Sequence, residues 1–181
     1  MASSSSNPLV LPYGGRQPDL ARAAFVAPGA AVIGDVVLGE DASVWYHTTV
    51  RGDVNWIRIG NRTNLQDGCV VHVDSGRFPT QIGDEVTVGH RVILHGCTVE
   101  ELALIGMGAV LLNGVVVGRG SLVAAGAVVR EGMHIPPGTL VAGVPAVVRR
   151  TLDATAIDEF RASAAHYVEL AHAHRALVND A

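Results

Sequence analysis

The chain has 181 residues, a formal net charge of −4 at pH 7, 49% hydrophobic residues and only 4% aromatic residues. A hydrophobic fraction this high excludes a disordered chain, and so few aromatic rings mean that Val, Ile, Leu and Ala must fill the core. All 13 basic residues are Arg, which excludes Schiff-base and P-loop lysine chemistry. A mildly acidic chain without a basic cluster also argues against a nucleic-acid partner.

Residues 1–24 are expected to form an N-terminal arm without a core of its own. They hold no basic segment followed by an apolar run of signal-peptide length, so we expect an unprocessed, cytoplasmic protein. Cys69 and Cys97 agree with this expectation, because two thiols without a CxxC spacing are usually core residues in a reducing compartment. The longest uncharged stretch, residues 102–118, is interrupted by glycines and is shorter than the roughly 20 residues of a membrane-spanning helix. No membrane partner is expected.

A six-residue repeat of aliphatic side chains organises residues 25–148. Its positions are Val26, Val32, Leu38, Val44 and Val50, then Ile59, Leu65 and Val71, then Ile82, Val88 and Leu94, then Val99, Ile105, Leu111, Val117, Val123, Val129, Ile135 and Val141. Neither the helical period of about 3.6 nor the strand period of about 2 explains this spacing. Each hexapeptide is predicted to form one short strand and one corner, so that three of them close one coil of a parallel β-helix. The predicted fold class is an all-β solenoid.

Three irregularities interrupt the repeat. A three-residue insertion lies between Val50 and Ile59, and a five-residue insertion, Asp74–Phe78, lies between Val71 and Ile82. The step that follows Leu94 is one residue short. Insertions at corners form loops, and loops carry functional sites.

After Pro145 the apolar pattern changes to a helical period, so residues 149–181 are predicted to form a C-terminal helix packed on one face of the β-helix. Asp153 or Asp158 lies near its start. The apolar stripe consists of Ile157, Phe160, Ala164, Tyr167, Val168 and Ala171.

Three histidines fall inside the regular part of the repeat. His72 and His95 each follow an inward residue on the same face, one coil apart, and Arg51 has the equivalent place one coil earlier. His90 belongs to the preceding face, across a corner, so one metal ion is hard to reach for all three within a monomer. If copies pack with threefold symmetry, His90 of a neighbour can meet the other two and leave an open fourth coordination position.

A structural interpretation of the same residues stays open. A single histidine on a β-surface is more often solvated than bound to a metal. On this interpretation Arg51 and Asp53 form only an interface ion pair, and Gln66 and Asp67 make only corner hydrogen bonds. The remaining histidines share no column and are expected on the surface or the helix: His47, His134, His166, His172 and His174.

The sequence resembles the γ-class carbonic anhydrase family of the left-handed hexapeptide β-helix superfamily, over roughly residues 25–148. The segments that carry the resemblance are Ser43-Val44-Trp45, Arg51-Gly52-Asp53-Val54-Asn55, Ile59-Gly60, Thr63-Asn64-Leu65-Gln66-Asp67-Gly68, Val71-His72-Val73, Ile82-Gly83-Asp84, Val88-Gly89-His90, Leu94-His95-Gly96-Cys97-Thr98, Ile105-Gly106-Met107-Gly108-Ala109 and Gly143-Val144-Pro145-Ala146. The hexapeptide is typical of the whole superfamily, whereas the combination of Arg-Gly-Asp, Asn-x-Gln-Asp and three histidines is more specific. The left hand of the coil is implied by the resemblance alone.

The resemblance implies a homotrimer with His72, His90 and His95 as ligands of zinc, or of ferrous iron or cobalt, between subunits. It implies reversible hydration of carbon dioxide to bicarbonate by a metal-bound hydroxide. The other implied site residues are Gln66 and Asn64 beside the bound water, Arg51 and Asp53 as organisers of the site, Asp67 near the pocket, and Tyr167 as the pocket tyrosine. Val54 and the Glu-free insertion depart from the family's pattern of acidic proton shuttles, which puts rapid turnover in doubt.

Two other functions remain open. Many hexapeptide proteins are acyltransferases that use one histidine as a general base at a subunit interface. A metal-binding trimeric scaffold without useful turnover is the second alternative, and the missing acidic shuttle favours it.

Overall fold

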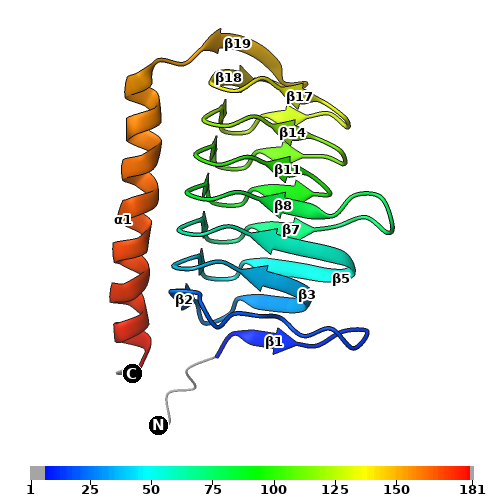
Figure 1. Cartoon of the computed structure of the whole chain (residues 1–181), viewed down its shortest axis with the longest axis vertical. Coiled ribbons are helices and arrows are strands. Elements are labelled where there is room, and N and C mark those ends of the chain that lie inside the picture. Colours follow the sequence, from blue (N-terminus) through cyan, green and yellow to red (C-terminus); the bar gives the residue numbers. More distant parts are fainter. Residues whose placement is uncertain (1–6, 180–181) are drawn as a thin grey trace.

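The computed structural model describes residues 7–179, which form a triangular parallel β-solenoid with one long helix along its side (Figure 1). The predicted fold class, a left-handed parallel β-helix of hexapeptide repeats followed by a C-terminal helix, is confirmed.

The short strands lie on three faces, each built from successive coils. The first face holds β7 (Val70–His72), β10 (Ile93–His95), β13 (Val110–Leu111) and β16 (Val128–Val129). The second face holds β8 (Thr80–Ile82), β11 (Thr98–Val99), β14 (Val116–Val117) and β17 (His134–Ile135). The third face holds β2 (Phe25–Val26), β4 (Ser43–Val44), β6 (Asn64–Leu65), β9 (Thr87–Val88), β12 (Leu104–Ile105), β15 (Leu122–Val123) and β18 (Thr139–Ala142).

Two longer strands, β3 (Ala31–Leu38) and β5 (Thr49–Ile59), run across a corner and join the first two faces into one sheet. The three-residue insertion lies within β5, and the register of the pair shifts between Gly34 and Val36 of β3. Gly34 has a φ of +79°, and a Cβ atom there would lie 2.2 Å from the carbonyl oxygen of Gly52. The insertion is therefore extended strand, and it carries Asp53 to the edge of the first face.

The core is the aliphatic column that the repeat predicts. Every position of the predicted series is buried except Val26, which is partly exposed. Ile57 is a further core residue, because β5 continues past the corner where the repeat is interrupted. Cys69 and Cys97 are free and buried, as expected.

Both ends of the solenoid carry an extra strand. Within the segment expected as an arm, β1 (Leu9–Leu11) pairs in parallel with β3, and Leu20 and Ala23 pack against the core. At the other end, β19 (Val147–Thr151) pairs in antiparallel fashion with β18, so the expected boundary at 148 falls inside a strand. Residues 1–6 and 180–181 of the expected terminal segments lie outside the described residues.

Helix α1 (Ala154–Asn179) returns along the third face, from β19 to the level of β2 (Figure 1). Asp153 caps its start, because its Oδ1 accepts a hydrogen bond of 3.0 Å from the backbone N–H of Ala156. Phe160, Ala164 and Ala171 of the predicted stripe are buried. Within residues 7–179 there is no helix with the length and apolar character that crossing a membrane requires.

Candidate metal centre

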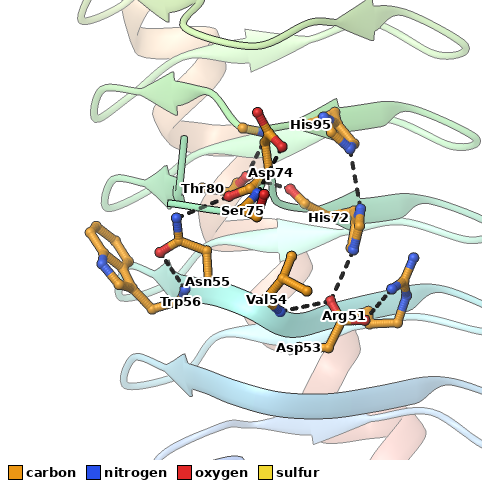
Figure 2. Close-up of polar contacts among 11 residues, drawn as sticks. Arg51, Asp53, Val54, Asn55, Trp56, His72, Asp74, Ser75, Thr80 and His95 are labelled. Atoms are coloured by element: carbon orange, nitrogen blue, oxygen red, sulfur yellow. Dashed lines mark hydrogen bonds and ion pairs between the residues drawn. The ribbon is translucent and has the colours of Figure 1, made fainter. Parts of the chain in front are cut away.

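His72 and His95 lie side by side on the outer surface of the first face. They are paired in register at the ends of β7 and β10, as their spacing predicts. Nδ1 of His72 is 3.1 Å from Nε2 of His95, and the ring centroids are 5.1 Å apart. Figure 2 shows the two rings aligned in a column above Asp53 and Arg51. Two imidazole nitrogens therefore converge on one point.

The opposite nitrogen of each ring contacts a fixed oxygen acceptor. Nε2 of His72 lies 3.0 Å from Oδ1 of Asp53, whose other oxygen forms an ion pair with Arg51. Nδ1 of His95 lies 2.6 Å from Oδ1 of Asn113. Hydrogen bonds of this kind orient metal-binding imidazoles and fix their tautomers.

Asp53 stays ionised in this arrangement. Burial raises the pKa of its carboxyl group, but hydrogen bonds from His72 and Arg51 and the positive charge of Arg51 outweigh burial, so the pKa lies below its ordinary value. An ionised carboxylate only accepts hydrogen bonds. Asp53 therefore holds the proton of His72 on Nε2.

The donor set of this pair fits a divalent metal ion. With the His72 proton on Nε2 and the His95 proton on Nδ1, the nitrogens that face each other both present lone pairs. Two lone pairs 3.1 Å apart repel unless a cation lies between them. Nitrogen ligands about 2.0–2.1 Å from a tetrahedral zinc ion are themselves about 3.3 Å apart, close to the spacing observed.

His90 lies elsewhere in the same subunit. It follows β9 on the third face, and its Nδ1 is 2.8 Å from Oδ2 of Asp67. Both residues line a shallow hollow in the surface together with Arg91, Met107 and Gly108. Across residues 7–179, no three His, Cys, Asp or Glu side chains gather closely enough to hold a metal ion. A single subunit therefore offers two imidazoles at one place and a third at another.

The remaining predicted site residues lie on the side of His90. Asn64 and Gln66 are buried, and Nε2 of Gln66 donates a hydrogen bond of 3.2 Å to Oδ1 of Asn64. Tyr167 of α1 packs edge-on against Trp45, with ring centroids 5.5 Å apart. Burial raises the pKa of Tyr167, and the negative charge of Asp67 raises it further. The predicted residues thus form two groups: Arg51, Asp53, His72 and His95 in one, and Asn64, Gln66, Asp67, His90 and Tyr167 in the other.

Sequence reasoning missed Asn113 and the role of the insertion next to it. Leu94 pairs with Leu111, so the coil here is 17 residues long, one short of three hexapeptides, and Leu112 rather than Asn113 is in register with His95. The contact of Asn113 with His95, 18 residues earlier, therefore lies one position off the strand register, and no spacing in the sequence signals it. The one-residue deletion after Leu94 obscured the register, and an asparagine before Gly114 reads as an ordinary turn residue.

Fold and site together define a hexapeptide-repeat β-helix protein with an outward-facing histidine pair. No family model matches the chain. The carbonic anhydrase of Geobacillus kaustophilus is 46% identical over 169 residues, which cover 93% of this chain and 92% of that protein. The mitochondrial gamma carbonic anhydrase 1 of Arabidopsis thaliana is 49% identical over 166 residues, or 89% of this chain. The chain belongs to the γ-class carbonic anhydrase family.

The lengths of these relatives differ, since the chain spans only 60% of the Arabidopsis protein. Among solved structures, a Bacillus cereus protein named as a proposed acetyltransferase superimposes with a TM-score of 0.91 at 41% identity. That match covers 95% of this chain and 99% of the other. Proteins with a comparable identity to this chain are therefore named both as carbonic anhydrases and as an acetyltransferase.

Proposed function

We propose that the chain catalyses the reversible hydration of carbon dioxide to bicarbonate at a zinc site shared between the subunits of a homotrimer. The observation that carries the proposal is the pair of facing imidazole nitrogens, 3.1 Å apart, in two rings whose other nitrogens each contact an oxygen acceptor. Membership of the γ-class carbonic anhydrase family supports the same reaction.

In this proposal His72 and His95 of one subunit bind the metal together with His90 of the partner subunit. The separation of His90 from the other two within one chain supports a site between copies. A bound divalent cation supplies Lewis acidity, which makes water a nucleophile at neutral pH. Ferrous iron and cobalt also accept imidazole ligands.

The protein's own residues bind and orient the reactants. Asp53 and Asn113 keep the protons of His72 and His95 away from the facing nitrogens. On this proposal the amides of Gln66 and Asn64, which are hydrogen-bonded to each other, orient carbon dioxide and the attacking oxygen by hydrogen bonds. Arg51 compensates the charge of Asp53. Asp67 lines the hollow beside His90, and Tyr167 lies close enough to Asp67 for its charge to raise the pKa of the phenol.

Acyl transfer is the second candidate, favoured by the name of the Bacillus cereus structure. An acyltransferase of this fold needs one histidine base and a groove for an acyl carrier. Two imidazoles held with their lone pairs toward each other suit a cation better than a general base, which needs its lone pair free to accept a proton.

The test is stopped-flow hydration of carbon dioxide by zinc-loaded or iron-loaded protein, prepared under anaerobic, reducing conditions. His72→Ala should lose metal and reduce hydration by more than about 100-fold, because it removes a ligand. His134→Ala, an exposed histidine on the second face, is the matched control and should retain both. Fully metallated wild-type protein without hydration would favour the scaffold alternative, and acetyl transfer from acetyl-coenzyme A would favour the acyltransferase.

A further inference from the structure

The five-residue insertion folds over the corner that follows His95. Its ends are joined by a hydrogen bond of 3.0 Å from the backbone N–H of Asp74 to the carbonyl of Phe78. The ring of Phe78 covers Gly114, where a Cβ atom would lie 3.1 Å from its Cε1. The insertion therefore packs against the coil that carries Asn113.

Asp74 orients the amide of Asn113. Its Oδ2 lies 3.5 Å from Nδ2 of Asn113, and Oδ1 accepts a bond of 2.7 Å from the backbone N–H of Ser75. A carboxylate accepts and does not donate, so the NH₂ group of the amide must face it. The carbonyl oxygen of Asn113 then has to face the other way, toward His95.

The oriented amide in turn fixes His95. At 2.6 Å, Oδ1 of Asn113 accepts a hydrogen bond from Nδ1–H of His95, which leaves the lone pair on Nε2. That lone pair faces His72. The reverse tautomer would place two acceptors, the Asn113 oxygen and Nδ1, against each other.

The backbone makes room for this contact at Gly96. A Cβ atom there would lie 2.6 Å from Oδ1 of Asn113 and 2.7 Å from Cβ of Phe78, and the φ of Gly96 is +58°. Any other residue would push Asn113 and the insertion away from His95. The hydrogen bond between His95 and Asn113 thus depends on three separate parts of the chain: Gly96, Asn113 and the Asp74–Phe78 insertion.

We propose that Asn113 is a positioning residue for the metal site, and that the insertion acts through Asp74 to keep its carbonyl oxygen on His95. The inference rests on the proposed metal site and deepens it. The inference gives the Asp74–Phe78 insertion a function that needs no glutamate. The insertion sets the tautomer and the direction of the His95 ring. A purely structural role would make Asn113 only a corner hydrogen bond, with no effect on metal affinity.

The test measures zinc affinity by competition with a chelator, together with the visible absorption spectrum of the cobalt-loaded protein. Asn113→Ala should weaken zinc binding about 10- to 100-fold, the usual effect of removing an acceptor behind a metal-binding histidine. It should also alter the cobalt spectrum. Asn55→Ala is the matched control, because Asn55 contacts the insertion through the carbonyl of Asp74, at 3.0 Å, without touching a histidine. It should retain wild-type affinity.

A double variant separates positioning from folding. Asp74→Asn alone frees the amide of Asn113 to turn and should weaken zinc binding. Combining Asp74→Asn with Asn113→Asp reverses donor and acceptor, since the new amide donates to the new carboxylate while the carboxylate still accepts from His95. The combination should restore affinity toward wild type, whatever either single variant does to stability.

Three results would overturn the inference. Asn113→Ala could bind zinc like wild type, Asn55→Ala could weaken binding equally, or the double variant could fail to recover affinity while remaining folded. Wild-type protein that binds no zinc, iron or cobalt would overturn the proposed function and this inference with it. In the first three cases wild-type protein still binds metal, so the two failures are distinguishable.

Discussion

For single residues, the acceptor behind each histidine decides which nitrogen is available. The carboxylate of Asp53 and the amide of Asn113 are chemically different, yet both hold a proton on the far side of an imidazole ring. Asp53 contacts Nε2 of His72, whereas Asn113 contacts Nδ1 of His95. The nitrogens left facing each other are for this reason Nδ1 of His72 and Nε2 of His95. Replacing either acceptor changes the lone-pair geometry without removing a ligand.

If the chain hydrates carbon dioxide as proposed, proton transfer should limit its turnover. Val54, at the edge of the site next to Asp53, is 48% exposed and has no titratable group. Without a positioned acid, the proton released in each cycle leaves through water or buffer. We expect small imidazole buffers to raise kcat substantially while kcat/KM stays nearly constant, and Val54→Glu to act likewise, as stopped-flow assays over a buffer series would measure.

A high kcat that does not change with buffer concentration would contradict this prediction. Another group would then serve as the shuttle. Asp74, Asp67 and Tyr167 are the candidates to substitute next.

The two cysteines should be inert in the folded protein. Burial raises the pKa of Cys69 and of Cys97 to about 12. At pH 8 the reactive thiolate would then be only about one part in 10⁴ of each thiol. Iodoacetamide should label neither cysteine in native protein and both in denaturant, as measured by mass spectrometry. Rapid labelling of native protein would show that the first or second face opens in solution.

Among the elements, the long strands β3 and β5 determine where Asp53 lies. Their close approach requires Gly34, so Gly34→Ala should destabilise the fold by about 2–5 kcal/mol, from the left-handed backbone and overpacking together. Gly76→Ala is the control, because Gly76 has a similar φ of +80° but no atom within 4 Å of the place its new methyl group would take. It should cost about 1–2 kcal/mol. Denaturant unfolding of both variants measures the difference, and equal losses would refute the account of the corner.

Sequence periodicity predicts most of this architecture because each inward position makes the same contact in every coil. It predicts the alignment of His72 with His95 for the same reason. It does not reveal that β3 and β5 continue through a corner, since an insertion in a repeat looks the same whether it forms a loop or extended strand. It does not reveal Asn113 either, because that contact depends on the side chains of an insertion that follows no repeat.

For the whole molecule, the decisive feature is that the proposed ligands occupy two separate surfaces. His72 and His95 lie on the first face, while His90 lies beside the hollow at the corner after β9. A shared site makes assembly and metal binding depend on each other, because each subunit then supplies two ligands to one site and one to the next. Loss of His90 should weaken both.

Native mass spectrometry of the zinc-loaded protein, wild type and His90→Ala, tests this claim most directly, since it reports subunit number and metal content together. We expect wild type to be a trimer with one zinc ion per subunit, and His90→Ala to lose zinc and to dissociate more readily. A wild-type monomer that retains one tightly bound zinc ion, or a His90→Ala variant that keeps one zinc ion per subunit, would contradict the shared metal site.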